Sequence, residues 1–366
     1  MSAPFHGGDL AGFSKRFGIP EEKILDFSSN TNPLGIPESV RSLFSSLAQE
    51  LEHYPDVRCA ELKNEIAQRF GIFSDQIILG NGAMGVLSLA VRALKPRCAL
   101  LIEPSFCEYR RLLELEGCQI REIILKEGDS FQFSLPQLLS SLEGVDLLMF
   151  GHPNNPTGTA LRPEEMRTLL RETERRGIFV VADEAFADWR PEISCLAELE
   201  SAKRLLVVRS FTKFFSIPGI RAGFALGARE LIAQLERYQE TWSMNRLAQR
   251  IALTALRDET HERKTRDWFQ KEAGWFDAAF RVSGLKIYPS LANFFLLRLE
   301  NGLDFPDLFE FLGSKGIYVR PASGFAGLDA NYFRLALRLR PENEFLRDQM
   351  KEWVAHKREV TATHES

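Results

Sequence analysis

The chain of 366 residues is 45% hydrophobic and 26% charged, which is the composition of an ordinary folded protein. Its 46 basic and 50 acidic residues leave a net charge of −4, which gives no electrostatic reason to expect nucleic acid or a membrane as partner. No apolar run is long enough to span a bilayer, and we expect no secretory signal. The five cysteines are scattered without a CxxC pair, which favours a reducing cytoplasm over disulfides or a metal site.

Short apolar runs alternate with amphipathic helical stretches through the first part of the chain. The expected strands are 76–79, 99–103, 120–125, 147–151, 179–183, 205–209 and 222–226. Helix-period stretches lie between several of them, at 84–94, 108–116 and 163–176. This alternation predicts a mainly parallel sheet that is covered by helices on both faces.

The pattern changes in the second part of the chain. A long helical segment is expected over 230–258, followed by two helices and by separated strands at 286–288, 294–299, 318–320 and 332–339. These elements predict a smaller α+β domain. The expected division is an N-terminal segment at 1–35 that joins the small domain, a large domain at 36–260, the small domain at 261–356 and a frayed tail at 357–366.

The loop at 80–85 follows the first expected strand, at the strand end where open parallel sheets bind ligands. Its sequence, GNGAMG, matches the GxGxxG pattern of dinucleotide-binding proteins, and Glu103 stands about 20 residues further on, where those proteins carry an acid. Free backbone N–H groups at a helix N-terminus, however, bind phosphate of any kind. A tight turn without a ligand is the structural alternative, so this loop alone does not choose a cofactor.

Three later loops also carry polar residues after apolar strands. Asn155 lies in the proline-rich turn 151–158, which holds its amide ready to donate, although a purely structural turn has the same composition. Asp183 ends a buried strand and there needs a cation or a donor, unless it caps a helix. Lys213 follows the strand 205–209 among hydroxyl residues and phenylalanines, where a solvated surface lysine is the alternative.

Taken together, the four loops resemble the fold type I pyridoxal-phosphate enzymes of the aspartate aminotransferase superfamily. The resemblance implies an α/β large domain with a mainly parallel sheet, a small α+β domain, and pyridoxal 5'-phosphate (PLP) as cofactor. Lys213 would bind PLP covalently, and Asp183 would pair with the ring nitrogen and keep it protonated. The further cofactor contacts implied are Gly82, Ala83, Met84, Phe106, Asn155, Ser210 and Arg221. The GxGxxG loop then becomes a phosphate turn, and the nicotinamide interpretation falls away.

Within the superfamily, the sequence is most similar to the L-threonine-O-3-phosphate decarboxylases of cobalamin biosynthesis, with histidinol-phosphate aminotransferases as near relatives. The stretches that carry this similarity are 6–8, 25–35, 53–56, 183–186, 210–224 and 332–338. Phe186 favours the decarboxylases, because many aminotransferases have a tyrosine there. The implied reaction is decarboxylation of L-threonine O-3-phosphate to (R)-1-aminopropan-2-yl phosphate, which is the activity of a carbon–carbon lyase.

The resemblance also assigns the substrate pocket and the assembly. Arg334 would bind the substrate carboxylate, and Arg320 is the candidate for its phosphate, since the planar guanidinium suits both anions. The other implied substrate contacts are His6, Gly7, Asn32 and Asn155. The Tyr54 region resembles the segment that reaches the cofactor phosphate of a neighbouring subunit, which implies a homodimer with shared active sites.

Three alternatives stay open from the sequence. Phosphoserine is one methyl smaller than the expected substrate, and a pocket discriminates such a group by only about 1–3 kcal/mol. An aminotransferase acting on histidinol phosphate would use the same loops. A catalytically idle PLP-binding regulator is opposed by the intact set of Lys213, Asp183, Asn155 and Arg221. The sequence departs from its relatives at 83–85 and at His152, which weakens the claim to an identical substrate.

Overall fold

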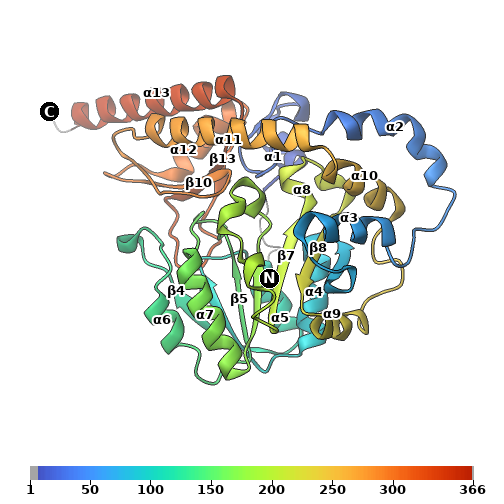
Figure 1. Cartoon of the computed structure of the whole chain (residues 1–366). Helices are drawn as coiled ribbons and strands as arrows, with labels where there is room; N and C mark the ends of the chain where they lie inside the picture. Colours follow the sequence, from blue (N-terminus) through green and yellow to red (C-terminus); the bar gives the residue numbers. More distant parts are fainter. Residues whose placement is uncertain (1–6, 365–366) are drawn as a thin grey trace.

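The computed structural model describes residues 7–364, which form a large α/β unit beneath a smaller sheet with its own helices (Figure 1). The large sheet has the strand order β2-β8-β7-β6-β5-β3-β4, and β8 runs antiparallel to both of its neighbours while the other strands run parallel. Its strands are β2 (Ile77–Asn81), β3 (Cys98–Glu103), β4 (Gln119–Ile124), β5 (Leu147–Gly151), β6 (Phe179–Asp183), β7 (Leu205–Ser210) and β8 (Ala222–Gly227). The predicted, mainly parallel sheet is confirmed.

The central strands are buried and mostly apolar because both faces of the sheet are covered, and their polar residues stand at the carboxyl ends of β6 and β7. In β5, Leu148 and Phe150 enter one hydrophobic core, whereas Leu147 and Met149 enter a second core on the opposite face. The second core is closed by α4 (Gly82–Leu94), α5 (Glu108–Leu115) and α9 (Arg229–Glu236). The first is closed by α3 (Ala60–Phe70), α6 (Leu135–Ser140), α7 (Pro163–Arg176) and α10 (Arg246–Leu256).

The smaller sheet is antiparallel, with the order β12-β13-β10-β9. Its strands are β9 (Leu285–Ile287), β10 (Phe294–Leu299), β12 (Arg320–Pro321) and β13 (Tyr332–Ala336), and its helices include α12 (Phe305–Ser314) and α13 (Arg340–His364). The remaining helices are α1 (Leu10–Phe17), α2 (Glu38–Glu50), α8 (Phe211–Phe214) and α11 (Glu259–Ala279). No helix among the described residues combines the length and apolar character needed to cross a membrane.

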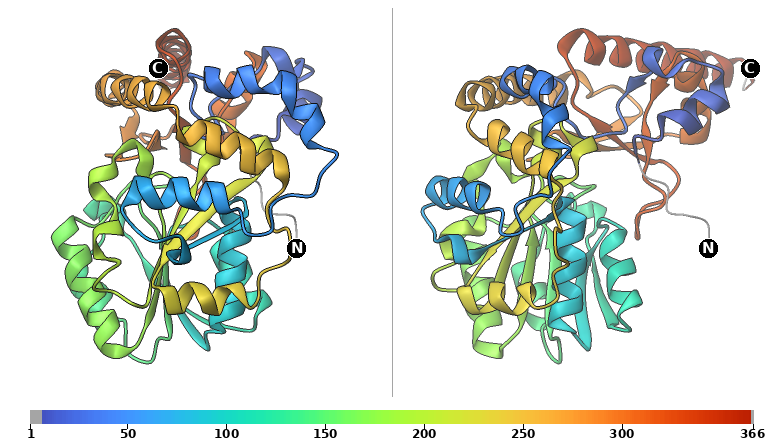
Figure 2. Two further views of the ribbon diagram at one scale, coloured as in Figure 1. Left: turned by 45° about the vertical axis from the view of Figure 1, so that its right-hand side comes forward. Right: turned by 90° about the vertical axis from the view of Figure 1, so that its right-hand side faces the viewer.

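The N-terminal segment lies beside the C-terminal elements, as the blue and red parts of Figure 2 show. Its strand β1 (Leu25–Asp26) pairs in parallel with β11 (Ile317–Tyr318). In α1, Phe13 stacks on Tyr318 with ring centroids 4.6 Å apart. These contacts bring the residues that follow β1 over the large sheet, where the candidate site lies.

One expectation about a helix is wrong. The segment 230–258 is broken: α9 ends at Glu236 and α10 begins only at Arg246. The backbone turns at Trp242, whose φ of 58° is left-handed, and Asn245 starts α10 anew by accepting a hydrogen bond from the Ala248 amide.

The tail expected to fray at 357–366 is helical as far as His364. Lys357 pairs with Asp307 at 2.8 Å, and Arg358 donates to Ser283 Oγ at 2.6 Å. These contacts hold the C-terminal part of α13 against neighbouring elements beyond residue 356, where the predicted small domain ends.

Candidate active site

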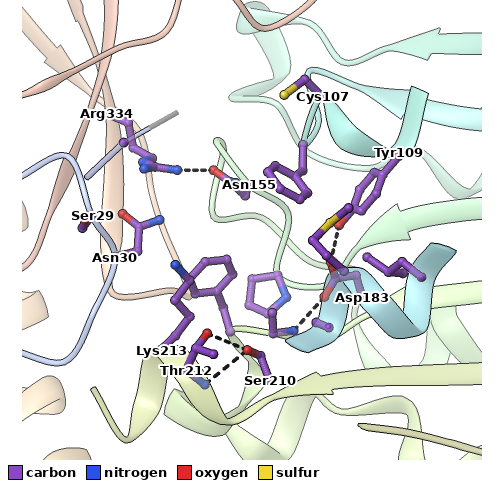
Figure 3. Close-up of a pocket in the computed structure, with 18 of the residues that line it drawn as sticks. Ser29, Asn30, Cys107, Tyr109, Asn155, Asp183, Ser210, Thr212, Lys213 and Arg334 are labelled. Carbon is purple, nitrogen blue, oxygen red and sulfur yellow. Dashed lines mark hydrogen bonds between the residues drawn. The ribbon is translucent and has the colours of Figure 1, made fainter. Parts of the chain in front are cut away.

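A cavity of about 240 Å³ opens at the carboxyl ends of β5, β6 and β7, where open α/β sheets bind ligands (Figure 3). It brings together most of the residues that the sequence singles out. Those that line it are Gly7, Ala83, Met84, Phe106, Asn155, Asp183, Ser210, Lys213, Arg221, Arg320 and Arg334. They come from strands, helices and loops far apart in the chain, so their convergence is a result of the fold.

Lys213 lies on α8, the single short helix that follows β7. Ser210 starts this helix: its Oγ accepts from the Thr212 amide at 3.3 Å and lies 2.8 Å from Thr212 Oγ1. Burial, followed by the positive charges of Arg334 and Arg221, lowers the pKa of Lys213 to about 8. The Lys213 amine therefore loses its proton far more readily than a surface lysine and can act as a nucleophile or a base.

Asp183, at the end of β6, is the acid of the cavity and is only 7% exposed. Its Oδ2 accepts a hydrogen bond from the Tyr109 hydroxyl at 2.7 Å, and its Oδ1 accepts one from the Ala185 amide at 3.0 Å. Burial raises the pKa of Asp183, and these two hydrogen bonds oppose the increase. A buried, oriented carboxylate of this kind is suited to a cationic ligand group.

A second buried acid lies directly behind Asp183. Glu184 is fully buried, and Arg209 approaches it to 3.2 Å. Burial alone would raise the pKa of Glu184, but the Arg209 charge and hydrogen bonds, including one from Ser194, outweigh it and hold the pKa at about 2. The charge of Glu184 is therefore matched inside the protein, whereas Asp183 faces the cavity.

The first turn of α4 and Arg221 form a cradle for an anion. Gly82 starts α4 with a φ of 73°, and Asn81 provides no side-chain cap for its amides. A Cβ atom on Gly82 would lie only 2.4 Å from Arg221 Nη2, so the absence of a side chain lets the guanidinium approach the helix N-terminus. Backbone N–H groups and a guanidinium meet at this point, as in phosphate sites.

Arg320 and Arg334 lie opposite this cradle, on the smaller sheet, as cross-strand partners in β12 and β13. Both side chains are buried. Arg334 Nη1 donates to Asn155 Oδ1 (Figure 3). Its Nη2 donates to the Ser28 carbonyl at 2.7 Å, and both acceptors are neutral. Burial and then the charge of Arg320 lower the pKa of Arg334 to about 9. Two adjacent guanidiniums therefore favour a ligand with more than one negative charge.

Two phenylalanines form apolar walls of the cavity. Phe106 packs edge-on against Tyr109, with centroids 5.6 Å apart and the ring planes at 88°. Phe186 packs edge-on against Phe294, with centroids 5.0 Å apart. Phe186 has no hydroxyl group, so this wall offers a flat ligand no hydrogen-bond donor from residue 186.

Asn32, which is expected in the substrate set, does not line the cavity. Its side chain is buried and donates to the Phe214 carbonyl at 2.8 Å and to Thr265 Oγ1 at 2.9 Å, and its backbone amide donates to the Lys213 carbonyl at 3.0 Å. Asn32 therefore braces the loop that carries Lys213 and is not available to a ligand.

Three other expected residues lie elsewhere. Tyr54 is 77% exposed and stacks on Trp242 with centroids 4.7 Å apart, away from the cavity of its own chain. Gly82 lies behind the wall that Ala83 and Met84 form. His6 lies outside the described residues.

The structure adds cavity residues that sequence reasoning missed. They are Ser28, Ser29, Asn30, Leu87, Cys107, Tyr109, Pro153, Ala185, Phe186, Thr212 and Phe325, of which Phe186 was noted only for its residue type. Asn30 is 3% exposed, and its Oδ1 has no hydrogen-bond partner among the described residues. The signal was present in the run Ser-Ser-Asn-Thr-Asn at 28–32, but the run does not tell which asparagine faces the ligand.

Comparison with known proteins defines the family. Residues 22–344 match the model of aminotransferase class I and II. The chain belongs to this family. A solved family structure, histidinol-phosphate aminotransferase from Sinorhizobium meliloti in complex with pyridoxal-5'-phosphate, superimposes with a TM-score of 0.85 over 96% of this chain and 95% of that chain, at 20% identity. The aspartate-aminotransferase-like fold type I is thereby confirmed.

Three curated relatives show which enzymes the chain is similar to. Threonine-phosphate decarboxylase from Salmonella typhimurium is 33% identical over 93% of this chain and 94% of its own length. The bifunctional adenosylcobalamin biosynthesis protein CobDQ from Leptospira interrogans is 31% identical over 95% of this chain and 41% of its own length. Histidinol-phosphate aminotransferase 1 from Bacillus cereus is 31% identical over 95% of this chain and 93% of its own length.

Proposed function

We propose that the protein is a PLP-dependent carbon–carbon lyase that decarboxylates L-threonine O-3-phosphate to (R)-1-aminopropan-2-yl phosphate in cobalamin biosynthesis. The observation that carries the proposal is the placement of Lys213 in one cavity with two adjacent buried arginines, Arg320 and Arg334. A phosphorylated amino acid has the two anionic groups that such a pair can bind. The similarity to threonine-phosphate decarboxylase supports the same substrate, and the similarity to the bifunctional protein CobDQ supports a role in cobalamin biosynthesis.

The residues of the cavity fit PLP. The first turn of α4, Ser210 and Arg221 would hold its phosphate, and the space above Gly82 that a Cβ would fill is taken by the Arg221 guanidinium. Asp183 would pair with the ring nitrogen, and Phe106 would contact the ring. When bound, PLP supplies an electron sink for the electron pair released at the substrate Cα.

The chain's own residues decide which substrate bond is aligned for cleavage. Arg334, oriented by Asn155, would hold the carboxylate, while Arg320 would hold the phosphate at the other end. Two fixed ends would restrict rotation about Cα and so favour alignment of the carboxylate bond for cleavage. The apolar faces of Phe106 and Phe186 keep water from the reacting carbon.

Lys213 completes the reaction as a proton donor. Loss of carbon dioxide leaves an electron pair at Cα, and one proton must be added there to give the amine. The Lys213 amine has a pKa of about 8 and can therefore carry this proton near neutral pH. The balance is one carboxylate lost as carbon dioxide and one solvent proton gained at Cα.

A histidinol-phosphate-type aminotransferase is the second candidate. The Bacillus cereus relative, at 31% identity, favours it, and the same lysine could remove the Cα proton. Phosphoserine in place of phosphothreonine is a variant of the first candidate. Phe186 supports the decarboxylase, since it deprives the ring of a hydroxyl donor, although a space-filling phenylalanine is compatible with either reaction.

We also propose that the protein is a cytoplasmic homodimer. Tyr54 and Trp242 form an exposed aromatic pair beside two further exposed residues, Leu51 and Val57. In a dimer Tyr54 could reach the cofactor phosphate of the partner. The five cysteine thiols form no disulfide, which fits a reducing compartment.

The test is an assay of three reactions with one preparation. The PLP-loaded protein receives L-threonine O-3-phosphate without a keto acid, and carbon dioxide and the amine product are followed; a second sample receives L-serine O-phosphate. Sustained release of carbon dioxide from the threonine derivative is expected. Turnover that occurs only with histidinol phosphate and 2-oxoglutarate together would replace the decarboxylase by the aminotransferase.

A further inference from the structure

Tyr109 reaches the acid of the cavity from the interior of the protein. It lies on α5, three residues after Phe106, and is only 2% exposed. Its hydroxyl donates to Asp183 Oδ2 at 2.7 Å, and its ring packs edge-on against Phe106. One buried side chain therefore contacts both residues that would hold the cofactor ring, Phe106 by packing and Asp183 by the hydrogen bond drawn in Figure 3.

The two hydrogen bonds of Asp183 fix the plane of its carboxylate. Tyr109 occupies one lone-pair direction on Oδ2, and the Ala185 amide occupies one on Oδ1. An ionised carboxylate has about four acceptor positions, so capacity remains for a donor from the cavity. The orientation of the acid is therefore set before any ligand arrives.

We propose that Tyr109 is a positioning residue for the cofactor, which holds Asp183 ionised and directed at the ring nitrogen. This inference rests on the proposed PLP dependence. Burial raises the pKa of Asp183, and the Tyr109 hydrogen bond is the largest influence that lowers it. Burial also raises the pKa of Tyr109, followed by the Asp183 charge, so its hydroxyl stays protonated and keeps donating. Without this donor, the proton that belongs on the ring nitrogen would shift toward the carboxyl group.

The test is the variant Tyr109→Phe, which removes the hydroxyl and keeps the ring. The apoprotein is titrated with PLP, and binding is followed by tryptophan fluorescence and by the visible absorption of the bound cofactor. Loss of a hydrogen bond to a buried charge predicts PLP affinity about 10- to 100-fold weaker, with a changed absorption spectrum. Affinity and spectrum equal to those of the wild type would overturn the proposal.

Tyr288 provides a matched control. Its hydroxyl also donates to a carboxylate, Glu127 Oε1 at 2.6 Å, and the side chain is 1% exposed, but it does not line the cavity. Tyr288→Phe should lower the stability of the protein and leave its PLP affinity unchanged. Equal weakening of PLP binding by both variants would show a general packing effect and contradict a specific role for Tyr109.

A double variant covers the case in which Tyr109→Phe alone does not fold. In Tyr109→Phe the buried charge of Asp183 loses the donor that Tyr109 provides, which destabilises the fold. Asp183→Asn removes that charge, so the double variant should fold more readily than Tyr109→Phe alone. If Tyr109 acts through Asp183, the double variant binds PLP no more weakly than Asp183→Asn alone. A further loss contradicts the proposal. These titrations contain no substrate, so a wild type that binds PLP without decarboxylating would refute the proposed reaction separately.

Discussion

Gly82 at the start of α4 permits a sharp test of the phosphate cradle. Replacing it with alanine adds a Cβ atom that would lie 2.4 Å from Arg221 Nη2 and 3.0 Å from Arg221 Cζ. Non-bonded atoms do not adopt the first distance, and the second is tighter than usual, so the guanidinium must move away from the helix N-terminus. The backbone φ of 73° is also unfavourable for a residue with a side chain.

Two separate costs follow for Gly82→Ala. The left-handed backbone conformation costs about 1–2 kcal/mol of folding free energy. The displaced guanidinium loses charge-assisted contacts with a phosphate, worth about 1.5–3 kcal/mol, which corresponds to PLP affinity roughly 10- to 150-fold weaker. The first cost appears in the unfolding of the apoprotein, and the second appears only when PLP binds.

Gly85 lies in the same turn and supplies the control. A Cβ at Gly85 would meet its nearest neighbour, the Asn81 Cβ, at 3.5 Å, which is an ordinary contact. Gly85→Ala should therefore keep the PLP affinity and add up to about 1 kcal/mol of stability through helix propensity. Both quantities are measured by denaturant unfolding and by PLP titration. If Gly82→Ala binds PLP as tightly as the wild type, the cradle assignment is wrong.

The other predictions concern the lysine, its loop and the arginine pair. Arg334→Lys keeps the charge but loses the planar fork, so kcat/KM falls roughly 100-fold in steady-state assays, whereas Arg338→Lys, outside the cavity, has little effect. The rate at which the apoprotein takes up PLP covalently should rise with pH through about 8, because only the unprotonated Lys213 amine attacks; a pH-independent rate would contradict this. Asn32→Ala removes the donor to the Phe214 carbonyl, so the free energy of unfolding should fall by about 1–3 kcal/mol and kcat should fall more than KM changes.

The sequence predicts the positions of several strands correctly. The strands β5 and β6 coincide with the expected runs, because a buried parallel strand is apolar throughout and ends abruptly at polar loop residues. The segment 230–258 does not form the single helix that the sequence predicts. The left-handed backbone at Trp242 and the new helix start at Asn245 interrupt it at 237–245. Single-residue backbone events of this kind leave little trace in hydrophobic periodicity.

The sequence likewise predicts some residues of the candidate site and not others. Motifs singled out Lys213 and Asp183 by their residue types and their places at strand ends, and the structure places both at the cavity. They could not tell Asn30 from Asn32, two residues apart, one of which lines the cavity while the other braces the Lys213 loop. Tyr109 was missed because it reaches Asp183 through tertiary packing of α5 against the sheet, which no local pattern encodes.

The central claim is that the bond cleaved at the substrate Cα is the one to the carboxylate. The most direct measurement is turnover of L-threonine O-3-phosphate by the PLP-loaded protein in D2O without a keto acid, with the products analysed by mass spectrometry and NMR. The account predicts carbon dioxide and amine in equal amounts, with one solvent deuterium at C1 of the amine. Recovered substrate that carries deuterium at Cα, with no carbon dioxide released, would show cleavage of the C–H bond and contradict the account.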